Sequence, residues 1–180
     1  TLIKSISGIR GTIGGKPGEN LPLGDHKKFG SLGEWIKRKD PKSSYKVVVG
    51  RDARISGEIC ENLVISTLNS LGIDVINLGL STTPTVEVIV PKHEADGGII
   101  LTASHNPKQW NALKLLNEKG EFVSANDGKE ILAIAEVDNF MFADVDTLGK
   151  TRIMEDAIDQ HIQDIEIPKP ATIKSVIETA

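Results

Sequence analysis

The apolar positions of this chain follow two periods in turn, one typical of buried strands and one typical of amphipathic helices. Short runs of β-branched and aliphatic residues predict strands at residues 47–49, 74–78 and 99–102. Apolar residues at helical spacing predict helices at residues 56–71, 85–90 and 126–137. Because strands alternate with helices, we expect an α/β layer architecture.

Residues with known capping preferences flank two of these predicted helices. Ser56 is expected to cap the start of the first helix, and Gly72 its end. Thr82 and Pro84 suit the start of the second helix, and Pro91 is expected to end it.

Beyond residue 110 the pattern predicts a hairpin and then a connector. Residues 113–116 and 121–123 flank a polar stretch and are expected to form the two arms of the hairpin. Residues 153–165 have one apolar helical face. We therefore divide the chain into a domain of residues 1–150 and a connector of residues 151–180, which begins a further domain.

Composition restricts the partners and the compartment. The 180 residues carry a formal net charge of −4, which gives no electrostatic footprint for nucleic acid or for an anionic membrane. No apolar run approaches the roughly 20 residues that span a bilayer, and the single Cys60 cannot form an internal disulfide. We expect a cytoplasmic protein that binds any anion through a local cluster of cations.

The stretch Leu-Thr-Ala-Ser-His-Asn-Pro at residues 101–107 carries most of the predicted chemistry. Ser104, His105 and Asn106 present a hydroxyl, an imidazole and an amide directly after an apolar run. Pro107 biases its neighbour toward extended backbone, so we expect a stiff, non-helical loop. Open α/β sheets usually place their chemistry at the carboxyl ends of strands, and this serine is expected to lie there.

Two cations indicate what Ser104 does. Adjacent serine and histidine residues rarely form a hydrolase site, and no G-x-S-x-G motif surrounds this serine. Lys114 lies downstream and Arg10 upstream, and a serine among cationic donors suits phosphoryl transfer. A lysine's pKa falls readily on desolvation, whereas arginine stays protonated. We therefore favour Lys114 as the proton shuttle and Arg10 as a fork for phosphate oxygens.

Two further loops have weaker signals. Residues 8–16 are rich in glycine but fail the spacing of a P-loop, and Pro17 stands where that motif needs Ser or Thr. Arg51, Asp52 and Arg54 lie between a predicted strand and a predicted helix start. They suit either an anion site or an internal Arg–Asp pair that shapes the loop, and both alternatives stay open.

Three motifs in order make the chain similar to a known family. Gly-Ile-Arg-Gly at residues 8–11 and Gly-Arg-Asp-x-Arg-x-Ser-Gly at residues 50–57 precede Thr-Ala-Ser-His-Asn-Pro at residues 102–107, with Asn111 and Lys114 after it. The chain resembles the first domain of the α-D-phosphohexomutases, which include phosphomannomutase/phosphoglucomutase and phosphoglucosamine mutase. The implied fold is a three-layer α/β/α domain with a mixed, mainly parallel sheet, the first of four domains.

The resemblance implies an isomerase that moves phosphate between the 1- and 6-positions of a hexose phosphate through a hexose 1,6-bisphosphate. By match, Ser104 would rest as phosphoserine and bind Mg²⁺ through a phosphoryl oxygen. His105, Lys114 and Arg10 match active-site positions, and the last two match residues proposed for proton transfer. The remaining residues expected to contact phosphate or substrate, or to support the loops, are Asn106, Asn111, Arg51 and Asp52.

Departures from the family pattern limit what is implied. Ala112 stands where the family usually has glycine, and Gln109 or Trp110 where an acidic residue is common. The metal loop, sugar-selecting loop and C-terminal phosphate loop of the family would belong to domains 2 to 4, so this chain alone is expected to be inactive. The alternative function is a non-catalytic sugar-phosphate binding or interaction module with the same fold. Such a module would lack the metal loop and would never carry a phosphorylated serine.

Overall fold

A seven-stranded sheet lies at the centre of the computed structural model, which describes residues 2–5, 8–15, 20–21, 26–137 and 140–165. The strands are β1 (Leu2–Ser5), β2 (Gly8–Thr12), β3 (Tyr45–Arg51), β4 (Ile73–Leu80), β5 (Gly97–Leu101), β6 (Trp110–Leu116) and β7 (Thr151–Ile153). The helices are α1 (His26–Lys39), α2 (Gly57–Ser70), α3 (Thr83–Lys92), α4 (Ala125–Glu136) and α5 (Ala157–Gln163), with one 3₁₀ turn, η1 (Val145–Thr147). Each predicted strand and helix overlaps one of these elements, except the second arm of the predicted hairpin, residues 121–123.

The sheet has a parallel half and an antiparallel half. Its strand order is β1-β2-β6-β5-β3-β4-β7. The neighbours from β5 through β3 and β4 to β7 are parallel, whereas those from β1 through β2 and β6 to β5 are antiparallel. The predicted mixed sheet is confirmed, but in the described part of the chain it is evenly divided rather than mainly parallel. The physical reason is that β6 returns directly from β5 through a short loop, and such a connection reverses the strand direction.

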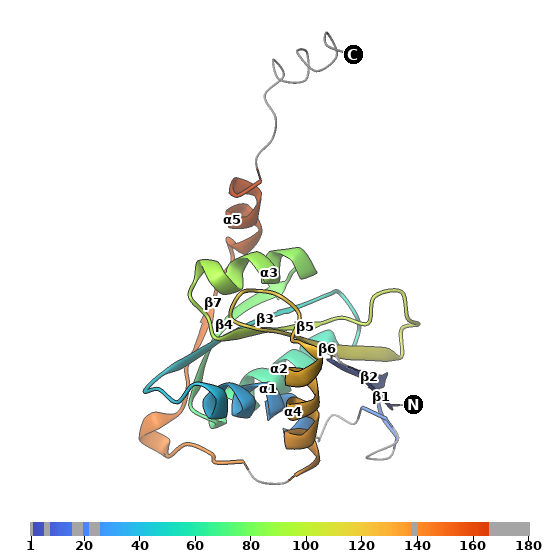
Figure 1. Ribbon diagram of the computed structural model, residues 1–180. Coiled ribbons are helices and arrows are strands. Elements are labelled where there is room, and N and C mark those ends of the chain that lie inside the picture. Colours follow the sequence, from blue (N-terminus) through green and yellow to red (C-terminus); the bar gives the residue numbers. More distant parts are fainter. Residues whose placement is uncertain (1, 6–7, 16–19, 22–25, 138–139, 166–180) are drawn as a thin grey trace.

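Helices cover both faces of the sheet (Figure 1), with α1, α2 and α4 on one side and α3 and α5 on the other. Successive side chains along β3 point to opposite faces of the sheet. Val47 and Val49 belong to the hydrophobic cluster under α1, α2 and α4, while Val48 belongs to the cluster under α3 and α5. Central strands that are buried on both faces read as continuous apolar runs, which confirms the three-layer α/β/α fold.

The ends of the helices agree with the predicted caps in part. The Thr82 hydroxyl accepts a hydrogen bond from the Thr85 N–H at the start of α3, as predicted. Ser56 precedes α2, but its side chain makes no capping hydrogen bond. Gly72 follows the end of α2 with a φ of +76°, a conformation that favours glycine. Pro91 does not end α3 but lies in its last turn, one residue before the helix stops.

The predicted hairpin forms in its first arm, which belongs to β6, and in its turn. The Asn117 N–H donates to the Glu121 carbonyl over 2.8 Å, so the polar stretch reverses the chain. The second arm pairs with the end of β6 only, through the Leu116–Phe122 bridge and the Val123 N–H, which donates to the Leu115 carbonyl over 3.1 Å. It cannot pair further along β6, because β2 occupies that edge up to Lys114 and β5 occupies the other edge.

Residues 151–165 lie against the rest of the domain. β7 extends the sheet beside β4, and α5 packs on α3. On the predicted apolar face of this segment Ala157 is buried, but Ile158, Ile162 and Ile165 are exposed by 46%, 53% and 52%. Residues 166–180 lie outside the described residues, and the domain division at residue 150 stays a prediction.

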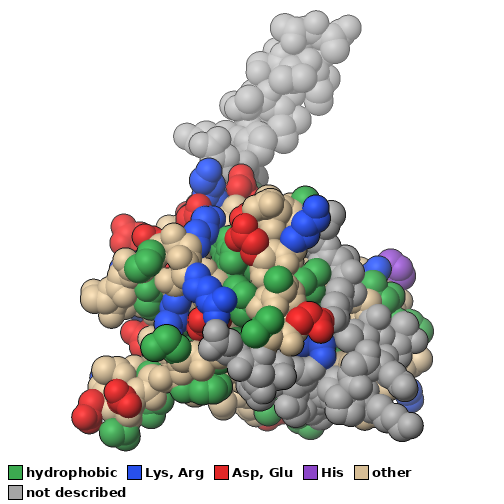
Figure 2. All heavy atoms as spheres, turned by 60° about the horizontal axis from the view of Figure 1, so that its bottom comes forward, with side chains coloured by type: hydrophobic (Ala, Val, Ile, Leu, Met, Phe, Trp, Pro, Cys, Tyr) green, Lys and Arg blue, Asp and Glu red, His purple; other side chains and the backbone are tan. Residues whose placement is uncertain are grey.

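One face of the molecule carries charges of both signs (Figure 2). Figure 2 shows acidic and basic side chains interspersed over the face that comes forward from below in Figure 1, which fits the small net charge of −4. In the segments that the structure describes, no helix has both the length and the apolar character needed to cross a bilayer.

Candidate functional site

The loops that follow β3 and β5 meet at one edge of the sheet. These strands are parallel neighbours, and Arg51 at the end of β3 pairs with Leu101 at the end of β5. The Asp52 N–H then donates to the Leu101 carbonyl over 3.0 Å, which joins the two loops at their origin. Residues 102–109, hereafter the Ser104 loop, connect β5 to β6. The serine therefore lies after the carboxyl end of a strand, as the sequence predicts.

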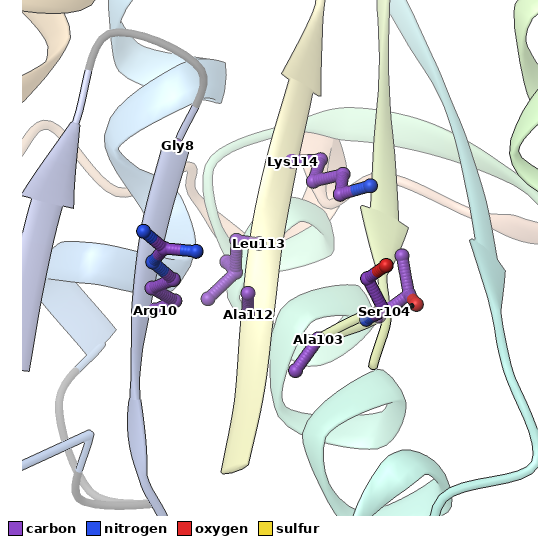
Figure 3. Close-up of a pocket in the computed structure, with 8 residues that line it drawn as sticks. Gly8, Arg10, Ala103, Ser104, Ala112, Leu113 and Lys114 are labelled. Carbon is purple, nitrogen blue, oxygen red and sulfur yellow. Dashed lines mark hydrogen bonds between the residues drawn. The ribbon is translucent and has the colours of Figure 1, made fainter. Parts of the chain in front are cut away.

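A pocket of about 220 Å³ opens at this edge of the sheet (Figure 3). It is lined by Gly8, Arg10, Thr102, Ala103, Ser104, Ala112, Leu113 and Lys114. Arg10 pairs with Ala112 across β2 and β6, and Gly8 pairs with Lys114, so both cations stand on the same face of the sheet. In Figure 3 the Lys114 amine extends from β6 toward the β5 side, where Ser104 lies, and Arg10 stands on β2. The structure thus brings Ser104, Arg10 and Lys114 to one pocket.

Ser104 itself has an unusual backbone conformation. Its φ is +55°, in the left-handed region that residues other than glycine rarely adopt. Its N–H donates to the Thr102 hydroxyl over 3.2 Å, which holds the turn. Its Oγ lies 3.5 Å from Nδ1 of His105, too far for the strong hydrogen bond that would activate a hydrolase nucleophile. An exposed serine in strained backbone at a pocket rim is typical of a functional site.

Lys114 and Arg10 give the pocket a positive lining. The Lys114 ammonium lies 5.9 Å from the centre of the Phe122 ring, within the range of a weak cation–π contact. The Arg10 side chain is exposed. The eight lining residues include no aspartate or glutamate. An anion that enters this pocket meets two cations and no carboxylate among the described residues.

Arg51 and Asp52 are engaged within the protein. The Arg51 Nε donates to Glu61 over 3.0 Å, and its Nη1 donates to the Asp52 carbonyl over 3.3 Å. The Asp52 carboxylate accepts from the backbone N–H of Arg54 over 3.1 Å and from its Nε over 3.2 Å. These contacts support the alternative in which the two residues shape the loop.

Asn111 is fully buried and does not line the pocket. Its amide nitrogen donates to the Ser56 hydroxyl over 3.0 Å, and its Oδ1 accepts from the Ala112 N–H over 2.8 Å. The same nitrogen lies 3.7 Å from the sulfur of Cys60, which is buried in α2. Asn111 thereby joins β6 to the start of α2, so its place fits loop support rather than contact with substrate.

Two residues that shape this site were given no role of their own from the sequence. Thr102 holds the Ser104 turn, and Gly8 lets β2 approach β6 closely. Arg54 was expected either to bind an anion or to pair with an aspartate of its own loop, and it also donates to four carbonyls between residues 104 and 110. Nothing local to position 54 indicates a contact 50 residues away.

The described residues do not form a magnesium site by themselves. Mg²⁺ prefers six oxygen ligands, usually including carboxylates. The described part of the chain holds no group of three or more His, Cys, Asp or Glu side chains placed to bind a metal ion. Ser104, the expected metal-binding residue, has no acidic neighbour among the residues that line the pocket.

Comparisons with known proteins agree with this fold. Residues 3–141 match the family profile described as phosphoglucomutase/phosphomannomutase, alpha/beta/alpha domain I. A phosphoglucosamine mutase of Nautilia profundicola is 34% identical over 174 residues, which cover 93% of this chain and 39% of that protein. A phosphoglucomutase/phosphomannomutase of Thermococcus kodakarensis is 36% identical over 163 residues, which cover 88% of this chain and 34% of that protein.

A solved structure shares the fold. The phosphoglucomutase/phosphomannomutase family protein from Burkholderia thailandensis superposes with a TM-score of 0.71 at 21% identity, over 93% of this chain and 38% of that one. The chain therefore spans less than two fifths of the length of these relatives. Because the family profile matches most of its residues, the chain belongs to the phosphoglucomutase/phosphomannomutase family, as the α/β/α domain I of such a protein.

Proposed function

We propose that this chain is the phosphoserine-bearing domain of a phosphohexomutase, an intramolecular phosphotransferase that interconverts hexose 1-phosphate and hexose 6-phosphate. The observation that carries the proposal is Ser104, exposed in strained backbone at the rim of a pocket that Arg10 and Lys114 also line. A phosphoryl dianion on this serine would face cationic side chains, which favour charge on a transferring phosphate.

The proposed reaction has two phosphoryl transfers. In the first, the bond between Ser104 Oγ and phosphorus breaks, and a bond forms between phosphorus and the free hydroxyl oxygen of a hexose monophosphate. The proton of that hydroxyl ends on Ser104 Oγ, with Lys114 as its carrier. In the second, the hexose 1,6-bisphosphate returns its other phosphoryl group to Ser104, and the serine's proton passes back to the sugar oxygen.

The other expected residues have supporting roles. Arg10 presents a planar fork of N–H donors that suits the phosphate oxygens. His105 lies beside the serine and is exposed. Asn106 is partly buried in the Ser104 loop, where its N–H donates to the Ala103 carbonyl over 3.1 Å.

Completion of the site requires more than the described residues. We expect Mg²⁺ to bind a phosphoryl oxygen on Ser104 and to take its other ligands from elsewhere in the complete protein. The hexose phosphate substrate, the bisphosphate activator, the partner domains 2 to 4 and a cytoplasmic location belong to the same proposal. This chain alone would then be inactive or nearly so, because it spans little more than a third of its relatives.

Substitution of Ser104 in the complete protein tests the proposal. Turnover of glucose, mannose and glucosamine 1-phosphates, primed with the matching 1,6-bisphosphates, is measured for the wild type, Ser104→Ala and Ser43→Ala. Loss of the phosphate carrier should lower kcat by more than about a thousandfold. Ser43 is an exposed serine in the loop before β3, so its variant should keep full activity.

Two results would contradict the proposal. Near-normal turnover by Ser104→Ala would remove Ser104 from the chemistry. A wild-type protein that binds hexose phosphates, turns none over and never carries phosphoserine would be the non-catalytic module instead.

A further inference from the structure

We infer that Arg54 is a positioning residue, whose guanidinium fixes the backbone of the Ser104 loop and thereby the place of the serine oxygen. The inference rests on the proposed phosphoryl transfer at Ser104, and it concerns a residue outside the pocket lining. Arg54 lies between β3 and α2, next to the loop that carries the serine.

The Arg54 side chain uses every donor it has. Arginine carries five N–H groups in a rigid, planar arrangement. Nε donates to the Asp52 carboxylate, and the four remaining N–H groups meet four backbone carbonyls. Nη2 donates to the carbonyls of Ser104 (2.6 Å) and Asn106 (2.9 Å), and Nη1 to those of Pro107 (3.0 Å) and Trp110 (3.1 Å).

This saturation decides between the two roles that the sequence leaves open for Arg54. An arginine that binds substrate phosphate must have N–H groups directed at the anion. All five N–H groups of Arg54 already have protein acceptors, and its side chain is only 11% exposed. Arg54 therefore acts on the loop and not on the substrate.

The Ser104 loop needs such a partner. Its carbonyls at residues 104, 106 and 107 do not belong to a strand, so no neighbouring strand supplies them with hydrogen-bond donors. Four carbonyl oxygens that converge on one point repel each other unless a cation lies between them. The guanidinium supplies both the charge and four correctly directed donors. It thus stabilises a loop in which Ser104 holds a φ of +55°.

Asp52 fixes the guanidinium in turn. Its Oδ1 accepts from the Arg54 backbone N–H, and its Oδ2 from the Arg54 Nε. The carboxylate therefore binds both the backbone and the guanidinium of Arg54. Asp52 in turn is joined to β5 through its own N–H. The chain of contacts runs from the sheet through Asp52 and Arg54 to the serine.

A fixed loop matters for rate more than for affinity. Phosphoryl transfer requires the serine oxygen, phosphorus and acceptor oxygen to lie nearly in line, and a displacement of about 1 Å can lower the rate about a hundredfold. Arg54 does not contact substrate in the proposed site, so ground-state binding should change little. Loss of Arg54 is therefore expected to lower kcat and leave KM nearly unchanged.

The experiment uses the complete protein as wild type, Arg54→Lys, Arg54→Met and Arg38→Lys. Lysine keeps the charge but has three donors at one atom, so it cannot meet four carbonyls and a carboxylate. Both Arg54 variants should show a kcat about 10- to 100-fold lower, with KM within about twofold of wild type. Arg38 pairs with Glu34 within α1, away from the pocket, and its variant should match the wild type.

A direct readout accompanies the steady-state constants. After rapid mixing of the dephosphorylated protein with hexose 1,6-bisphosphate, intact mass measures how fast one phosphoryl group appears on the protein. This rate should fall in Arg54→Lys in proportion to kcat. Circular dichroism at the assay temperature establishes that each variant is folded.

Each outcome bears on one of the two proposals. If wild-type protein never gains phosphate and shows no turnover, the proposed function fails, and the role of Arg54 fails with it. If the wild type is phosphorylated and active, two results would overturn the role of Arg54 alone. One is an Arg54→Lys variant that keeps more than a third of the wild-type kcat, and the other is a variant in which only KM changes. If both Arg54 variants fail to fold, Asp52→Asn decides: it should lower kcat at unchanged KM, and an unchanged kcat would overturn the inference.

Discussion

Replacement of Gly8 by alanine should force β2 away from β6. Both strands line the pocket, so the pocket should be disturbed as well. Gly8 has a φ of +138°, and a methyl group there would lie 1.9 Å from the Leu113 carbonyl oxygen. Ordinary contact begins near 3.4 Å, so the methyl is about 1.5 Å too close, the difference between the two distances. The obstacle is backbone, which cannot rotate away as a side chain can.

The expected cost has two parts. An L residue in positive φ costs about 1–2 kcal/mol, and overpacking against a fixed neighbour costs about 1–3 kcal/mol. Gly8→Ala should therefore lower the free energy of unfolding by about 2–5 kcal/mol. Gly14→Ala is the matched control, because Gly14 has a φ of +89° but no described atom within 4 Å of an added methyl. The Gly14→Ala variant should therefore show only the cost of the positive φ, a decrease of about 1–2 kcal/mol in the free energy of unfolding.

Urea unfolding of the two variants measures the difference. In the complete protein, Gly8→Ala should also lower kcat, because Arg10 lies two residues further along the same strand and moves with it. A Gly8→Ala variant that is destabilised within about 0.5 kcal/mol of Gly14→Ala would refute the reasoning from close strand approach.

Two further predictions concern the support behind the pocket. Asn111→Leu should lower the free energy of unfolding by about 2–4 kcal/mol in urea, since the buried Ala112 N–H and the Ser56 hydroxyl lose their partner; a loss below about 1 kcal/mol would contradict it. Burial raises the pKa of the Cys60 thiol from 9.0 to about 11, so the unfolded thiol ionises first. The free energy of unfolding should therefore fall between pH 9 and pH 11, and it should fall more steeply in wild type than in Cys60→Ala. An equal dependence on pH in the two proteins would contradict this.

The central elements could be predicted because their signals are local. β5 and the middle of β3, residues 47–49, are apolar, since both faces of the sheet are buried there. β7 could not be predicted: all three of its residues are exposed, and it joins the sheet through backbone pairing with β4. α1 has a helical apolar pattern that Gly30 and Gly33 weaken. The structure explains the second glycine, since a methyl on Gly33 would lie 2.6 Å from Ile73.

The site, too, could be predicted only in part from the sequence. Ser104, Arg10 and Lys114 could be named from residue type and motif, and the structure places all three on one pocket. What the sequence could not supply was the direction of each side chain. Asn111 turns away from the pocket toward α2, and Arg54 turns toward the Ser104 loop, because both depend on which strands lie side by side.

Phosphopeptide mapping of Ser104 tests the central claim most directly. The complete protein is incubated with a hexose 1,6-bisphosphate whose phosphates are isotopically labelled, digested and analysed by mass spectrometry, before and after addition of excess unlabelled hexose 1-phosphate. We predict one labelled phosphoryl group on the peptide that contains Ser104, and its transfer to sugar on the second addition. Turnover that proceeds while this peptide stays unphosphorylated, or label that remains on Ser104 after the second addition, would contradict the account.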